Sequence, residues 1–253
     1  VCVRDMGGNN YIDFCLGGGY VTFGHGYEFD NSDQGALTLD STLMTSSFAT
    51  ANELLCTSTL EASVGMKCLG YAQSIESSLS MVNTFFSEVV VHNIFSDDAK
   101  TIEDARALSA SAQKKSQSFV INESVGTGRF VYPSIALKHK IPACGIIFGP
   151  GLANGCPFYP VCVSVTYTSA ITSPKLEALA PFLLKPSAIS EFMFATAIRS
   201  MEYYRKHCVV FNLQRIYKAF RSGLRSGIVA HKALDKICLD EQSGRILVKL
   251  INP

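Results

Sequence analysis

The segment Gly145-Ile-Ile-Phe-Gly-Pro-Gly-Leu-Ala-Asn-Gly155 contains the pattern that decides the fold. Its apolar run from Ile146 to Phe148 is typical of a short buried β-strand. The run stops at Gly149, Pro150 and Gly151, residues that favour a tight turn. Open α/β proteins place reactive groups in such turns, at the carboxyl ends of their strands. The segment therefore predicts an α/β protein with its functional edge beside Pro150.

The composition indicates a folded chain with a sizeable core. Of the 253 residues, 47% are hydrophobic and 17% are charged, which suits one large α/β domain or one domain with a small appendage. The net charge of +1 is unevenly distributed: residues 1–100 carry 3 basic and 12 acidic side chains (3 − 12 = −9), whereas residues 101–253 carry 19 and 9 (19 − 9 = +10). Two halves of opposite net charge attract each other or the halves of a second copy of the chain. A less favoured hypothesis is a basic surface for nucleic acid.

Nine cysteines are scattered along the sequence, none in a C-x-x-C motif and none near histidines at zinc-ligand spacing. Their odd number and apolar neighbours predict reduced thiols, and hence an intracellular, reducing compartment, either the cytoplasm or an organelle matrix. No metal site is expected. Residues 141–174 carry no charge and are long enough to cross a bilayer, but prolines and glycines interrupt them, so no membrane span is predicted.

The remaining sequence alternates between strand-like and helix-like segments. Gly7-Gly8-Asn9-Asn10 predicts the turn of a β-hairpin near the beginning. A helical pattern of apolar residues extends from Glu61 through Cys68 and Leu69. Strands are predicted over residues 88–95, 161–168 and 244–251, and a strand followed by a loop over residues 118–130. Helices are predicted over residues 97–113, 191–206 and 209–224, and a short helix followed by a turn over residues 135–142.

Several of these segments, in this order, resemble the class III pyridoxal-phosphate aminotransferases and glutamate-1-semialdehyde aminomutases, which have fold type I. The amino-terminal resemblance is carried by Asp5, Gly8, Tyr11, Ile12, Asp13, Phe14, Gly24 and His25. The resemblance of the opening segment to the family's lysine segment is carried by Gly149, Leu152, Gly155 and Pro157.

The resemblance implies an α/β fold of three layers with a mostly parallel sheet of the fold type I aminotransferase kind. We expect it to be truncated and to have a small α+β carboxyl-terminal part. The large domain is expected over residues 1–190, beginning with a hairpin region over residues 1–25. It is expected to be internally shortened around residues 74–95, because the family's aromatic-His-Gly segment is missing there. The small domain is expected over residues 191–253.

The resemblance also shows which positions of the family's chemistry differ in this chain. The Schiff-base lysine corresponds to Pro150, which has no amine. The aspartate that pairs with the cofactor's pyridine nitrogen corresponds to Asn122, and Glu123 beside it is expected to point to the other face of the strand. The phosphate-binding turn before a helix corresponds to Ser58-Thr59-Leu60-Glu61, where Thr59 and Leu60 replace a glycine and a hydroxyl.

These differences predict a pseudoenzyme without catalytic residues or a bound cofactor, acting as a structural or accessory subunit of a larger assembly. Its partners would be proteins, either a second copy as a homodimer or other subunits. One alternative is an active pyridoxal-phosphate aminotransferase or aminomutase with a rearranged site, in which Lys138, Lys140, Lys175 or Lys185 supplies the amine. A further alternative is a small-molecule-sensing module that keeps a reduced pocket.

Overall fold

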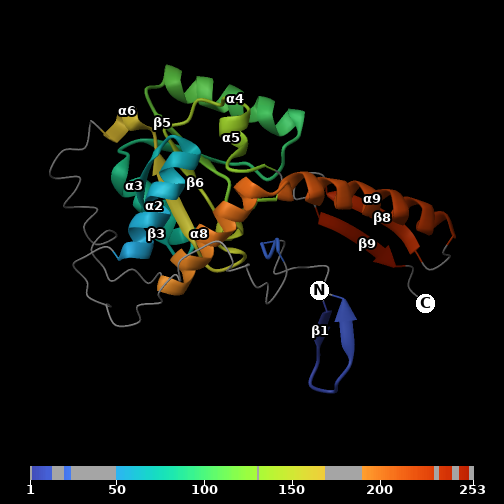
Figure 1. The fold of residues 1–253 in the computed structure, drawn as a ribbon. Coiled ribbons are helices and arrows are strands. Elements are labelled where there is room, and N and C mark those ends of the chain that lie inside the picture. The colour runs from blue at the N-terminus through green and yellow to red at the C-terminus, as the bar shows by residue number, and fades with distance from the viewer. Residues whose placement is uncertain are drawn as a thin grey trace.

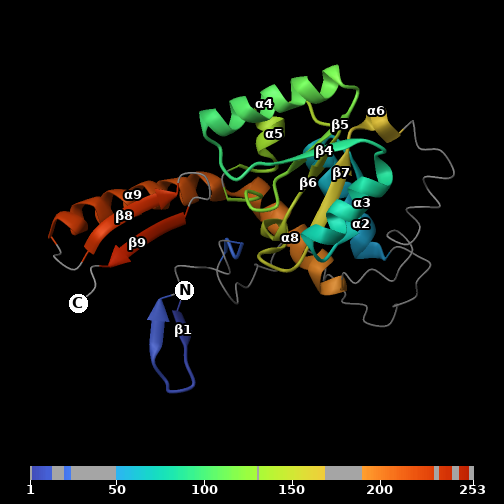
Figure 2. The same cartoon turned by 180° about the vertical axis from the view of Figure 1, so that it is seen from behind.

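The computed structural model describes residues 2–12, 20–23, 50–129, 131–168, 190–230, 234–240 and 245–250. Figure 1 shows a central sheet covered by helices, with a carboxyl-terminal helix and hairpin that extend to one side. The amino-terminal hairpin, β1 (Cys2–Arg4) and β2 (Asn10–Ile12), stands apart from the sheet in both Figure 1 and Figure 2. Its turn contains Gly8 at a φ of +87°, a conformation that glycine adopts without strain. The predicted hairpin is confirmed.

The central sheet has five strands in the order β3-β7-β6-β5-β4. Strands β4, β5 and β6 are parallel, β7 is antiparallel to β6, and β3 is antiparallel to β7. Four of the five strands therefore run in one direction, which confirms the mostly parallel sheet. The strands are β3 (Lys67–Ala72), β4 (Val89–Asn93), β5 (Ser118–Asn122), β6 (Gly145–Ile147) and β7 (Tyr159–Val163).

Both faces of the sheet are apolar because it lies between two helical layers. Alternate residues of β5 show this: Phe119 and Ile121 belong to the core of one face, and Val120 belongs to the core of the other. We call these the first and second faces. The first face is covered by α2 (Ala51–Val64), α4 (Ala99–Lys114), α5 (Ile135–Lys138) and α8 (Glu191–Lys206), and the second by α3 (Ile75–Phe85). The three-layer α/β architecture is thus confirmed.

Helix α8 packs directly against the central layers. Phe194, Ile198 and Met201 on one side of it are at most 1% exposed and join the core of the first face. This side contacts α2 and the short 3₁₀ helix η1 (Pro150–Ala153). Helix α8 therefore forms one wall of the region around Pro150.

The part of the chain after α8 is small and contains both helix and strand. Helix α9 (Val209–Ala230) follows α8, and the antiparallel hairpin of β8 (Leu234–Asp240) and β9 (Arg245–Leu250) lies along it. Among the residues that the structure describes, no helix is both long and apolar enough to cross a lipid bilayer.

Two predicted elements differ from the structure. The helical pattern through Cys68 and Leu69 was wrong, because the chain turns at Gly65, with a φ of +65°, and then pairs with β7 as strand β3. The strand predicted over residues 161–168 ends at Val163, and a short helix, α6 (Val165–Thr168), follows. Apolar spacing alone did not distinguish helix from strand in these short segments.

Candidate functional site

The carboxyl ends of β4, β5 and β6 form the candidate site. Asn93, Asn122 and Ile147 end these strands, and Asn122 is paired with each of the other two in register. Pro150 follows Ile147 by three residues, so it lies at the same edge. This is the edge at which open α/β sheets bind ligands.

Pro150 begins η1 in a tightly packed turn. The preceding Gly149 is extended, and the Pro150 carbonyl accepts a hydrogen bond of 2.8 Å from the Gly155 amide. A Cβ at Gly149 would lie 1.9 Å from the Ser124 carbonyl oxygen. A Cβ at Gly151 would lie equally close to the loop after β5, so the glycines are required by close backbone approach. The turn predicted from the sequence is present, and Pro150 is buried within it.

The aromatic ring of Tyr204, from α8, packs beside this turn. Its hydroxyl lies 2.7 Å from Thr22 Oγ1 and 3.4 Å from the Gly151 carbonyl oxygen. The ring stacks on Tyr132, with centroids 4.8 Å apart. Burial raises the pKa of Tyr204, so its hydroxyl is a neutral hydrogen-bonding group. A Cβ at Gly128 would lie 2.4 Å from that hydroxyl, which shows how closely the phenol fits the loop after β5.

Both polar atoms of the Asn122 side-chain amide are hydrogen-bonded to neighbouring residues. Its Nδ2 donates to Asn93 Oδ1 at 2.7 Å, and its Oδ1 accepts from the Ser124 amide at 3.0 Å. The residue is only 8% exposed. Asn122 therefore links the ends of β4 and β5 as a neutral group and brings no negative charge to this edge.

Glu123 is completely buried and points toward α5. Its carboxylate accepts hydrogen bonds from Ser134 Oγ at 2.7 Å, from the Ile135 amide at 2.8 Å and from the Ala136 amide at 2.7 Å. Burial raises the pKa of Glu123, and the three hydrogen bonds oppose that shift. Because both oxygens are occupied at the α5 amino terminus, Glu123 does not supply the charge that Asn122 lacks.

The residues Ser58-Thr59-Leu60-Glu61, expected from the resemblance to be a degenerate phosphate-binding turn before a helix, do not form such a turn. All four residues lie inside α2, where no helix begins. Leu60 is 1% exposed and packs in the core. Glu61 pairs with Lys67 at 2.7 Å and accepts from the Cys68 amide at 2.9 Å, so it joins the end of α2 to the start of β3. Leu60 is thus a core residue, and Glu61 connects α2 to β3.

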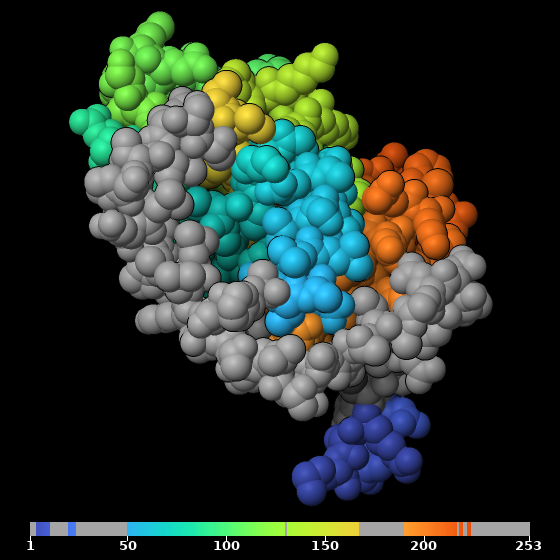
Figure 3. Space-filling view, turned by 60° about the vertical axis from the view of Figure 1, so that its left-hand side comes forward, coloured from blue at the N-terminus to red at the C-terminus, as the bar shows by residue number. Residues whose placement is uncertain are grey.

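Helix α2 actually begins at Thr50, eight residues earlier. Thr50 Oγ1 accepts from the Glu53 amide at 3.1 Å, and the Glu53 carboxylate accepts from the Thr50 amide, which makes a capping box. Thr57, in the second turn of α2, lies 2.6 Å from the hydroxyl of Tyr71, so the amino-terminal half of α2 packs near the carboxyl end of β3. The spacing Thr50-x-x-Glu53 was the sequence signal for this start. Figure 3 shows the outer side of α2 at the molecular surface.

Carboxylates surround this helix start. Asn52 donates to Glu191 Oε2 at 2.7 Å, which holds the first turns of α2 and α8 together. Burial raises the pKa of Glu53, and the negative charge of Glu191 raises it further. A helix amino terminus attracts anions, but here the carboxylates of Glu53 and Glu191 already lie in its positive potential. A phosphate group bound there would be repelled by both.

The residues at this edge do not fit a covalently bound pyridoxal phosphate. Pro150 offers no amine, Asn122 offers no charge, and Glu53 and Glu191 oppose a phosphate at the α2 amino terminus. Of the alternative lysines, Lys138 pairs with Asp97 at 2.6 Å on the exposed side of α5, and Lys140 is exposed just beyond it. Lys175 and Lys185 lie outside the described residues.

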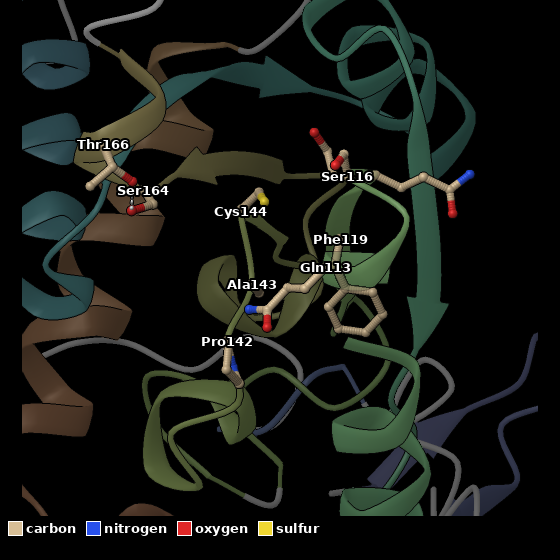
Figure 4. Close-up of a pocket in the computed structure, with 10 residues that line it drawn as sticks. Gln113, Ser116, Phe119, Pro142, Ala143, Cys144, Ser164 and Thr166 are labelled. Carbon is tan, nitrogen blue, oxygen red and sulfur yellow. Dashed lines mark hydrogen bonds between the residues drawn. The ribbon is translucent and has the colours of Figure 1, made fainter. Parts of the chain in front are cut away.

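A pocket of about 500 Å³ lies at the opposite edge of the sheet. Its lining includes Ser118 at the start of β5, Cys144 just before β6 and Ser164 just after the antiparallel β7. Figure 4 shows Phe119 and Cys144 among the uncharged side chains that line it. The pocket therefore belongs to the amino ends of the parallel strands and is separate from Pro150 and Asn122. Across the described ranges, no group of histidine, cysteine and acidic residues has the geometry of a metal site.

No protein-family model and no curated protein matches the sequence. Solved structures are nevertheless similar to it. Ornithine aminotransferase from Plasmodium yoelii is 13% identical, with a TM-score of 0.67 over 99% of this chain and 77% of that chain. FumI from Sphingopyxis sp. MTA144, solved as its PLP internal aldimine, is 12% identical, with a TM-score of 0.65 over 98% and 74%. Acetylornithine aminotransferase from Elizabethkingia anophelis is 14% identical, with a TM-score of 0.63 over 94% and 74%. The chain therefore has a truncated class III aminotransferase-like fold, as the order of its motifs predicted.

Proposed function

We propose that this chain is a non-catalytic protein with a class III aminotransferase-like fold, acting as a structural or accessory subunit of a larger assembly. The observation that carries the proposal is the buried Pro150 at the carboxyl end of β6, where the resembled family has its Schiff-base lysine. An imine cannot form without a primary amine. A packed proline here removes covalent attachment of the cofactor, and with it the usual chemistry.

Two further contacts support the loss of chemistry. The cofactor's ring is an electron sink while its pyridine nitrogen stays protonated, which requires an anionic partner. Asn122 is neutral and is held by Asn93 and Ser124. At the α2 amino terminus, Glu53 and Glu191 supply negative charge where a phosphate would need donors. The residues present therefore support neither covalent attachment of the cofactor, nor protonation of its ring nitrogen, nor binding of its phosphate. A lysine elsewhere in the site would restore only the covalent attachment.

The first prediction is that the purified chain neither retains pyridoxal phosphate nor transaminates. The chain is incubated with the cofactor, freed of excess by gel filtration, and examined for near-visible absorption before and after borohydride reduction. An ornithine aminotransferase treated in parallel supplies the positive control. We expect no absorption band and no reduced adduct in a peptide digest. A borohydride-stable adduct on any lysine would overturn the proposal and favour the active-enzyme alternative.

The variant Pro150→Lys separates loss of the amine from loss of the whole site. We expect it to remain inactive, because Asn122 still leaves the ring nitrogen without a charge. The double variant Pro150→Lys, Asn122→Asp is the matched comparison, since it restores both the Schiff-base amine and the carboxylate that pairs with the ring nitrogen. Transamination by the single variant would show that the surrounding contacts are intact and that only one residue separates this chain from an enzyme.

A further inference from the structure

Three cysteines from three different elements lie together beneath α2, and we call them the thiol cluster. They are Cys56 on α2, Cys68 on β3 and Cys162 on β7, all of them free thiols. Cys56 and Cys162 are fully buried, whereas Cys68 is half-buried. The cluster contributes to the core of the first face. Nothing in the aminotransferase-like chemistry uses it.

Cys68 and Cys162 occupy directly opposite positions of the antiparallel strands β3 and β7. Residues opposed in this way have Cα atoms about 4.5 or 5.5 Å apart. Disulfides need a Cα separation of about 4.4 to 6.8 Å, so either kind of pair is within range. The two thiols also lie within hydrogen-bond distance of each other. Their side chains therefore already face one another, and the backbone need not move far to join them.

A bulge in β3 helps to bring these side chains together. Cys68 is opposite Cys162 and Gly70 is opposite Val161, so Leu69 is an extra residue that has no partner in β7. Leu69 turns to the second face, while Cys68 and Tyr71 both pack against the first. Cys68 is thus held beside the buried thiol and retains access to solvent at the end of the strand.

We propose that Cys68 and Cys162 form an oxidisable pair, which hydrogen peroxide converts into a cross-strand disulfide. The sulfur of Cys68 attacks one peroxide oxygen, the O–O bond breaks, and Cys68 becomes a sulfenic acid as water leaves. The sulfur of Cys162 then attacks Cys68, its proton passes to the departing hydroxyl, and a second water is released. Two thiols and one peroxide give one disulfide and two waters. This inference is independent of the proposed function.

The order of attack follows from accessibility. Cys68 is the member of the pair that solvent reaches, whereas Cys162 is buried within the sheet. The hydrogen bond with Cys68 and then burial raise the pKa of Cys162, which makes it a poor first nucleophile toward a soluble oxidant. Oxidation is therefore expected to begin at Cys68 and to be slow compared with that of dedicated peroxide sensors.

The disulfide would bind β3 covalently to β7 at the point where the register shifts. It would close a loop of about 95 residues, and a long loop gives a large reduction in the entropy of the unfolded chain. For a domain of this size the corresponding rise in Tm is roughly 5 to 10 °C. Because the residues already face each other, native strain is expected to offset little of this gain.

The test treats the reduced full-length chain with hydrogen peroxide and follows its mass, its disulfide map and its Tm. We expect the mass to fall by two hydrogen atoms, the map to join Cys68 to Cys162, and the Tm to rise, with reversal by dithiothreitol. Cys68→Ser should abolish all three changes. This variant is expected to fold, because the position is half-buried. Cys162→Ala should give the same result, so either variant alone is sufficient.

The matched control is Cys156→Ser, a half-buried cysteine outside the thiol cluster, which should leave the disulfide unchanged. Two outcomes would overturn the proposal. A map that joins Cys56 to Cys68 would show that the cross-strand pair is not the reactive one. Oxidation confined to the exposed Cys208, as dimers linked between chains, would show that Cys68 does not react before an ordinary surface thiol.

Discussion

At the scale of single residues, Glu123 connects the end of β5 to the helix that follows it. Its carboxylate receives three donors from the first turn of α5, and its own amide donates to the Ile147 carbonyl at 2.9 Å. The residue thus holds together β5, β6 and α5 just behind Asn122. Its role in the structure is to stabilise the functional edge, whatever chemistry that edge performs.

We predict that Glu123→Gln lowers the free energy of unfolding by about 2 kcal/mol. The glutamine carbonyl would retain Ser134 and Ala136, but its amide nitrogen would face the Ile135 amide, leaving two buried donors opposed. Urea denaturation measures the loss. Glu103→Gln, an exposed position on α4, is the control and should change stability by less than about 0.5 kcal/mol. An unchanged stability for Glu123→Gln would mean that these hydrogen bonds add nothing to the fold.

The candidate site was only partly predictable at this scale. The sequence located Pro150 and Asn122, because a strand followed by small residues marks the carboxyl edge of an α/β sheet. It also anticipated that Glu123 would not replace the lost charge. It gave no sign of Tyr204, which reaches the site from α8, or of the Asn122–Asn93 hydrogen bond. Those contacts depend on tertiary packing between distant segments, and local patterns carry no information about it.

At the scale of elements, the predictable segments were those with strong local signals. Three consecutive valines marked β4. The helix predicted over residues 97–113 is α4 (Ala99–Lys114), whose Asp98 cap accepts from the Thr101 amide. Strand β3 was missed because Lys67-Cys-Leu-Gly-Tyr-Ala72 has no such signal and owes its conformation to pairing with β7. The resemblance placed a turn at residues 58–61, whereas the capping box of Thr50 and Glu53 begins α2 eight residues earlier.

We predict that Glu53→Gln stabilises the protein near neutral pH by roughly 0.5 to 1 kcal/mol, since the group is half-buried and partly screened by solvent. Glutamine keeps the capping box but removes the cost of burying the Glu53 charge, and with it the smaller repulsion from Glu191. Because the pKa of Glu53 is raised on folding, the charged form opposes folding. The free energy of unfolding of the native chain therefore falls as pH rises from about 4.5, the ordinary glutamate pKa, through the raised pKa of Glu53 in the folded state.

The measurement is the difference in unfolding free energy between Glu53→Gln and the native chain across that pH range. The difference should be near zero below pH 4.5 and should reach its full size at neutral pH. Thr50→Ala provides a contrast, because loss of the cap should destabilise by about 1 kcal/mol at every pH. A Glu53→Gln effect that does not vary with pH would show that the charge of Glu53 is not its cause.

At the scale of the whole molecule, one margin of the sheet is left open. Strand β4 is last in the strand order and pairs with β5 alone among the described residues. Its Val89, Val90 and Val91 are half-buried, and α3 covers the second face mainly over β3 and β7. The chain's two portions also carry opposed charges of −9 and +10, as counted from the sequence. Open strand edges and opposed charges both favour association with another chain.

We therefore predict that the isolated chain sediments as a dimer or larger species at low micromolar concentration. The edge of β4 is the surface to test, because its strand has no lysine, proline or bulge of the kind that keeps free edges apart. Val91→Lys places a charge in the middle of that edge and should weaken self-association at least about tenfold, or ~1.4 kcal/mol. Leu108→Lys is the matched control, since Leu108 is an apolar residue on α4 that is 39% exposed. If both variants sediment alike, association uses another surface; if the native chain is a monomer that co-purifies with nothing, the proposed subunit role is wrong.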